Sequence, residues 1–200
     1  MSTAKNNNKS NKGLYLSRFS QVAKLGILIF HTSDLASLWQ IKNTNNLHTT
    51  LKRYVQKGLL IRIYRGLYSL KPIEQLDPAL VGMKALHRYS YVSTETILVQ
   101  AGIIQQKFDQ ITLVSSVSKK FSVGPYGFRS RKMNDKFLYN GAGVTSEGGI
   151  KKASVGRAVA DLLYFNPNAY FDAEKLIDWK KVKAIQKAVG YPLTYNRYKK

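Results

Sequence analysis

The stretch NTNNLHTTLKRYVQKGLLIRIYRGLY, residues 43–68, carries the signals that decide the fold of the first part of the chain. It opens with four small polar residues of the kind that form turns and cap helices. Apolar residues then recur at helical spacing, which predicts an amphipathic helix from about Leu47 to Lys57. Gly58 follows at the position where helices often end in a left-handed residue.

The residues after Gly58 predict a β-hairpin. Residues 59–70 alternate in polarity like two strands, and Arg65-Gly66 supplies the turn between them. Ile61 and Ile63 are expected to face the core, which leaves the side chains between them and after them pointing outward.

The residues before this stretch predict two further helices. Apolar spacing favours a helix from Ser17 to Ile29. Thr32 or Ser33 can cap a second, short helix, with Asp34 in its first turn. Two helices joined by a tight polar turn and followed by a hairpin predict a winged helix-turn-helix DNA-binding domain over residues 14–72.

The charge of the chain points to a polyanionic partner. Its 200 residues are 44% hydrophobic and 12% aromatic, enough for a packed core, yet the formal net charge is +21. Residues 1–72 hold 12 lysines and arginines and one acid, Asp34. DNA is therefore the expected partner of this part of the chain.

The polar face of the 47–57 helix and the predicted hairpin supply the candidate DNA contacts. They offer cations for phosphates, and amides and a hydroxyl for base edges. An ordinary solvated helix face and a plain hairpin remain the alternatives. The candidate residues are Asn45, Asn46, Thr49, Lys52, Arg53, Gln56, Lys57, Arg62, Tyr64 and Arg65.

Composition predicts flexible ends and a boundary in the middle of the chain. Residues 1–13 form a disordered basic arm, and residues 193–200 form a basic tail. The arm either aids solubility or touches phosphates or a minor groove. Proline and acidic residues after residue 72 mark the start of a second domain, residues 73–192.

The second domain is predicted to be α+β, with helices flanking a small, short-stranded, mixed or antiparallel sheet. Helices are expected over residues 77–89, 96–101, 153–165 and 179–189. Strands are expected over 111–115, over 121–128 with breaks at Gly124-Pro125 and Gly127, and over 129–133 and 137–139. Glycines 141, 143, 148 and 149 predict loops. Arg157 and Asp161 lie one turn apart on the polar face of the 153–165 helix. They form either a surface ion pair or an anchor for a neighbouring strand or a partner.

Three stretches give the chain a family resemblance. Residues 51–68 resemble the winged helix of AbiEi-type antitoxins from abortive-infection systems, and the second domain adds YVSTETIL (91–98) and ASVGRAVADLL (153–163). The resemblance covers residues 17–190 and carries over Arg157 and Asp161. Gly156 departs from it, because the family usually places Glu before the Arg.

The resemblance implies a transcriptional repressor that binds inverted repeats in its own promoter and acts as the antitoxin of a type IV system. It implies a nucleotidyltransferase-like toxin as functional partner, without a stable complex, and a monomer in solution with two copies on DNA. The alternative is a protein-interaction module that binds its toxin or another partner directly, with DNA contact incidental.

Residue types argue against catalysis and against a membrane location. The chain has no cysteine, and its three histidines have no ligand-spaced partners, so neither a metal nor a cofactor is expected. Asp178-Trp179-Lys180 has a nuclease-like spacing, but it falls in a predicted helix rather than a strand. We expect a non-enzymatic, cytoplasmic protein, because no apolar run is long enough for a membrane span.

Overall fold

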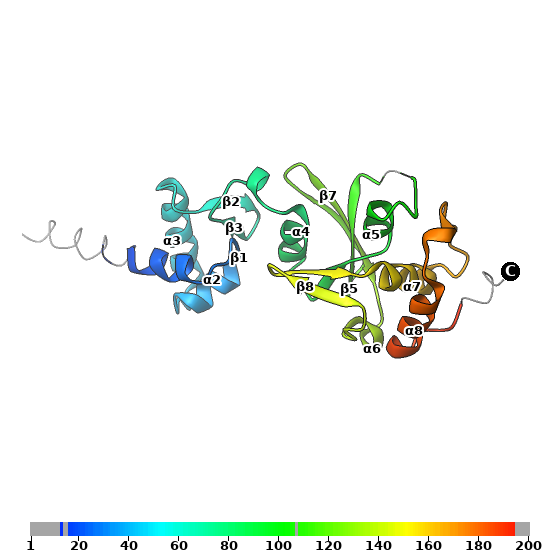
Figure 1. Cartoon of the computed structure of the whole chain (residues 1–200). Coiled ribbons are helices and arrows are strands. Elements are labelled where there is room, and N and C mark those ends of the chain that lie inside the picture. The colour runs from blue at the N-terminus through cyan, green and yellow to red at the C-terminus, as the bar shows by residue number, and fades with distance from the viewer. Residues whose placement is uncertain (1–12, 14–15, 107, 195–200) are drawn as a thin grey trace, which may run out of the picture. The chain divides into compact units, whose positions relative to one another are not determined.

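The chain is an α+β protein with two sheets, one in each of two compact units (Figure 1). The computed structural model describes residue 13 and residues 16–106 and 108–194. The units meet between Leu76 and Asp77, where the sequence placed a boundary between residues 72 and 73. The predicted arm, apart from Gly13, and most of the predicted tail lie outside the described residues. None of the described helices is long and apolar enough to cross a membrane.

The first unit contains a helix over residues 16–24, and β1 (Ile29–His31) follows it. The prediction of one helix up to Ile29 is wrong at its C-terminal end. Gly26 has a φ of +63°, which ends the helix. The buried Ile29 and Phe30 then pair with a strand forty residues away instead of extending the helix.

Side-chain caps set the starts of α2 (Thr32–Leu38) and α3 (Thr44–Gln56). His31, rather than Thr32 or Ser33, caps α2, and the Asp34 carboxylate accepts the His31 N–H at 2.8 Å. The Asn43 side chain accepts the Asn46 N–H at 3.0 Å. Because Asn43 caps it, α3 begins earlier than the predicted Leu47.

The predicted hairpin is confirmed as β2 (Ile61–Tyr64) and β3 (Leu67–Ser69). Its turn is Arg65-Gly66, and Gly66 has a φ of +74°. The sheet is antiparallel in the order β1-β3-β2. The hairpin is therefore tied through β1 to the start of α2.

One buried apolar cluster joins the helices of this unit to its hairpin. Trp39, at the end of α2, stacks on Tyr54 of α3 with ring centroids 4.9 Å apart. The cluster consists of Val22, Phe30, Leu35, Trp39, Leu47, Leu51, Tyr54, Leu60 and Tyr68.

The second unit is built on a six-stranded mixed sheet in the order β6-β7-β5-β4-β9-β8. The α4 helix covers one face of the sheet, and α5 and α7 lie against the other, with α8 packed on α7 (Figure 1). The elements are the 3₁₀ turn η1 (Ile73–Gln75) before the unit, then α4 (Pro78–Leu86), β4 (Ser90–Val92), α5 (Glu95–Gln100), β5 (Gln110–Ser115), β6 (Lys119–Val123), β7 (Tyr126–Lys132), α6 (Asp135–Leu138), β8 (Val144–Glu147), β9 (Ile150–Ala153), α7 (Val155–Phe165), the 3₁₀ turn η2 (Glu174–Leu176) and α8 (Trp179–Val189).

Two predictions for this unit are wrong. Residues 137–139 were expected to form a strand, but α6 occupies this segment because Asn134 caps it by accepting the Lys136 N–H. Residues 121–128 and 129–133 were expected to form separate strands, but β7 runs across this boundary from Tyr126 to Lys132. Glycines 148 and 149 form, with positive φ, the turn between β8 and β9, in agreement with the predicted loop. The long helices agree with prediction: α7 ends at Phe165 and α8 spans residues 179–189.

We predict that Gly82→Ala destabilises the C-terminal unit by about 1–3 kcal/mol, the usual cost of overpacking a core. Gly82 lies in α4 directly against the ring of Phe128, which is fully buried. Thermal unfolding followed by circular dichroism measures the change. Gly141→Ala is the control, because nothing lies within 4 Å of a Cβ added there. Equal stability of the two variants would contradict the packing argument.

Candidate nucleic-acid interface

All ten residues predicted to contact DNA are exposed. The α3 helix is held from its apolar side, where Leu47, Leu51 and Tyr54 are buried. This packing leaves its polar side toward solvent. On the hairpin, Arg62 and Tyr64 point outward and Ile61 and Ile63 are partly buried, as predicted.

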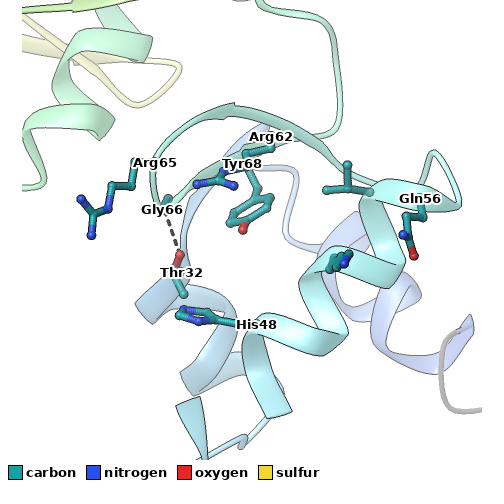
Figure 2. Close-up of a pocket in the computed structure, with 9 residues that line it drawn as sticks. Thr32, His48, Gln56, Arg62, Arg65, Gly66 and Tyr68 are labelled. Carbon is teal, nitrogen blue, oxygen red and sulfur yellow. Dashed lines mark hydrogen bonds between the residues drawn. The ribbon is translucent and has the colours of Figure 1, made fainter. Parts of the chain in front are cut away.

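A cavity of about 670 Å³ lies between α3 and the hairpin (Figure 2). His48, Lys52, Val55 and Gln56 line it from α3. Its remaining lining residues come from the start of α2 and from the hairpin, and they are Thr32, Arg62, Arg65, Gly66 and Tyr68. The cavity therefore brings together four of the predicted residues, which are Lys52, Gln56, Arg62 and Arg65.

The cavity wall is rich in positive charge. Lys52, Arg62 and Arg65 contribute cations, His48 adds an imidazole, and no acidic residue lines the cavity. Asp34 lies elsewhere, because its carboxylate caps α2. Within a concave wall of this kind the positive potential attracts anions more strongly than isolated surface cations do.

Hydrogen bonds fix the hairpin turn beside the cavity. The backbone N–H and the hydroxyl of Thr32 both donate to the carbonyl oxygen of Gly66, at 2.8 and 3.1 Å (Figure 2). A Cβ added at Gly66 would lie 3.4 Å from both His31 Nε2 and Thr32 Oγ1, in a backbone conformation that other residues rarely adopt. The turn that carries Arg65 is therefore held in one place relative to α2.

The other six predicted residues lie outside the cavity lining. At 3.6 residues per turn, Asn45, Thr49, Lys52 and Gln56 form one stripe along α3, and this stripe runs into the cavity wall. Asn46 and Arg53 project about 70–90° away from the middle of this stripe, by the same helical geometry. Lys57 is the C-cap of α3, and Tyr64 on the hairpin is 40% exposed.

Five lining residues were not predicted from the sequence. His48 lies one turn before Lys52, so the helical projection could have identified it. Val55 and Tyr68 are apolar or aromatic, so a search for polar and charged contact residues does not select them. Thr32 and Gly66 belong to the site only because a hydrogen bond joins residues 34 positions apart, and no local pattern predicts such a bond.

For Arg157 and Asp161, the prediction of a surface ion pair on the polar face of the helix is wrong, and the alternative, an anchor for a neighbouring strand, is confirmed. Both side chains hydrogen-bond the Tyr91 hydroxyl of β4. Both side chains are 0% exposed, because α5, α8 and β9 all pack around α7 and leave no side of this region open. Arg157 Nε donates to Asp161 Oδ1 at 2.7 Å. The other Asp161 donors are the hydroxyls of Tyr191 at 2.7 Å, Ser93 at 2.7 Å and Tyr91 at 3.0 Å.

This buried network is closed to ligands. Arg157 also donates to the carbonyl oxygens of Asn140 and Ala142, at 3.0 and 2.9 Å, so its guanidinium links α7 to the segment after α6. Burial raises the pKa of the Tyr91 and Tyr191 phenols above the ordinary value, and the charge of Asp161 adds to the effect. Both phenols therefore stay protonated and keep donating to Asp161.

Gly156, where the resembled family usually has Glu, lies at the contact between α7 and α8. A Cβ added there would lie 3.1 Å from Ile185 Cδ1 and 3.6 Å from Lys181 Cβ. The glycine thus permits a close approach of the two helices that a glutamate would prevent.

The nuclease-like triplet does not form a metal site. Asp178 caps α8 by accepting the Lys181 N–H at 3.1 Å, so the triplet is a helix start, not a strand. Among the described residues, no three His, Asp or Glu side chains come together in a group able to hold a metal ion.

No family model and no curated protein matches the sequence. Among solved structures, the chain is similar to the crystal structure of the RV2827C protein from Mycobacterium tuberculosis, with a TM-score of 0.50 and 12% sequence identity. The match covers 90% of this chain and 73% of that chain. At this identity the likeness concerns the fold alone.

We predict that Arg157→Met destabilises the C-terminal unit by about 3–5 kcal/mol, because it leaves the buried Asp161 carboxylate without its counter-ion. Arg157→Met combined with Asp161→Leu should restore much of the stability, since neither charge then remains buried. Urea unfolding of the single and double variants measures both effects. Lys181→Ala, which breaks the exposed Asp178–Lys181 pair, is the control and should change little. A double variant as unstable as Arg157→Met would contradict the pairing.

Proposed function

We propose that the N-terminal unit is a winged helix-turn-helix domain and that the protein is a sequence-specific DNA-binding repressor. The observation that carries the proposal is the acid-free cavity between α3 and the hairpin, where Lys52, Arg62 and Arg65 converge. The order of the elements also supports the proposal, because α2 and α3 are joined by a polar turn and the antiparallel β2–β3 hairpin follows.

The residues of the site have two different tasks in this proposal. Lys52 and Arg62 neutralise phosphates of the duplex and fix its position, a role that carries no sequence information. Asn45, Thr49 and Gln56, along the exposed stripe of α3, offer hydrogen bonds to base edges in the major groove. Arg65, at the hairpin turn, reaches a neighbouring groove or phosphate. Preference for one sequence then depends on α3, and affinity depends on both walls.

The biological setting rests on the resemblance to AbiEi-type antitoxins. It suggests that the DNA is the promoter of the protein's own operon, with inverted repeats that two copies of a monomeric protein occupy. It also suggests that the C-terminal unit opposes a nucleotidyltransferase-like toxin without a stable complex. The burial of Arg157 and Asp161 removes this pair from any contact with the toxin, so that role would belong to other residues.

We predict that the protein binds the DNA upstream of its own gene more tightly than a scrambled duplex of equal length. A mobility-shift titration at about 150 mM salt tests this, because non-specific binding is weak under such conditions. Equal affinity for the two duplexes would contradict the proposal and would favour a protein-interaction module with incidental DNA contact.

Two pairs of substitutions separate the proposed tasks. Lys52→Ala with Arg62→Ala should weaken binding to both duplexes and lower the slope of log Kd against log salt by about 0.9 for each phosphate that is no longer neutralised. Thr49→Ala with Gln56→Ala should reduce the preference for the upstream duplex and leave the slope unchanged. Lys187→Ala, on the exposed side of α8, is the control. If all variants behaved like this control, the cavity would not be the binding site.

A further inference from the structure

The second unit is as basic as the first. Residues 77–200 hold 20 lysines and arginines against nine acids. The residues from Gln110 to Asn134 contain five basic residues and no acid. These residues form β5, β6 and β7, at one end of the six-stranded sheet.

The register of the β6–β7 hairpin places two cations directly opposite one another. Lys120 pairs with Arg129 across the antiparallel strands, and both side chains are exposed. In an antiparallel pair such residues lie on the same face with Cβ atoms about 4.5–5.5 Å apart, and like charges in this arrangement destabilise the sheet. The fold therefore retains a repulsive contact that almost any uncharged residue would relieve.

Neighbouring groups do not neutralise these two cations. Arg131, two residues after Arg129 on the same face, forms an ion pair with the buried Glu95. Lys120 and Arg129 form no salt bridge with an acid in the part of the chain that the structure describes. The positive charge of Arg129 also repels that of Arg131. Burial, and in part this repulsion, lowers the pKa of Arg131.

Protection of a sheet edge explains only one of the two residues. Charged side chains, lysine above all, often keep an edge strand from pairing with other chains, and β6 is an edge of this sheet. Arg129, however, lies on β7, which is paired on both sides, with β6 and with β5. Its position opposite Lys120 needs another reason.

We propose that Lys120 and Arg129 form a phosphate-binding pair, through which the C-terminal unit makes a second contact with the nucleic-acid backbone. Two cations at this separation can share one phosphate group, which relieves their mutual repulsion on binding. A guanidinium and an ammonium contact the backbone without reading sequence. The inference rests on the proposed DNA binding of the first unit and adds a surface that this function does not require.

The test is the salt dependence of DNA binding by the full-length chain. The variant is Lys120→Ala with Arg129→Ala, and the control is Lys180→Ala with Lys187→Ala, which removes the same net charge from the exposed side of α8. Fluorescence anisotropy gives Kd for a long duplex carrying the upstream sequence over a range of NaCl concentrations. Thermal unfolding of each protein without DNA shows whether it remains folded.

We expect the Lys120/Arg129 variant to have a slope of log Kd against log salt that is lower by about 0.9, because the two cations share one phosphate. Its preference for the upstream over the scrambled duplex is unchanged, and its melting temperature is equal to or above that of the parent, because a repulsive pair is gone. The control keeps the parent slope.

If the variant and the control had equal slopes of log Kd against log salt, the proposal would be overturned. If the variant still preferred the upstream duplex in that case, the proposed function of the first unit would not be contradicted. Calorimetry with inorganic phosphate gives a further test. If the Lys120/Arg129 variant bound inorganic phosphate more weakly than the parent but kept the parent's slope of log Kd against log salt on the duplex, the proposal would also be overturned, because the pair would then bind a free anion. A parent protein that binds no duplex at low salt would overturn both proposals.

Discussion

Tyr54 makes the contacts on which the geometry of the first unit depends. Its ring is fully buried and stacks on Trp39 at the end of α2. Its carbonyl oxygen accepts the N–H groups of Leu59 and Leu60, at 2.9 and 3.4 Å, where the chain leaves α3 for the hairpin. One residue thus joins α2, α3 and β2. Because these contacts fix α3 relative to the hairpin, they also decide that Lys52 and Arg62 face the same cavity.

Unneutralised positive charge is the second constraint, and it acts in both units. The acids near the binding surfaces are already engaged: Asp34 caps a helix, and Glu95 pairs with Arg131. Where a charge is buried, as at Arg157, the fold supplies a carboxylate and several hydroxyls. No carboxylate lies in the cavity lining or across the β6–β7 hairpin to pair with the exposed cations there. A polyanion would supply the missing negative charge, and this is the common physical basis of both proposals.

The sequence predicted what local signals determine. The bounds of α8 follow from its capping Asp178 and from Gly190, and the hairpin follows from alternation around Gly66. Lys52 and Arg62 were identified from helix and strand periodicity. Periodicity could not predict β1, whose partner strand is distant, nor the burial of Asp161, whose donors Tyr191 and Ser93 lie 30 and 68 residues away. A helical projection separates polar from apolar sides, but it does not say which side another element covers.

The central claim is that α3 and the hairpin together hold a DNA duplex. The most direct measurement is a two-dimensional amide NMR titration of the ¹⁵N-labelled protein with the upstream duplex. We predict that the largest shift changes occur at Thr49, Lys52 and Gln56, along the exposed stripe of α3, and at Arg65 in the hairpin turn. Shift changes confined to other surfaces, with these four amides unmoved at saturation, would contradict it.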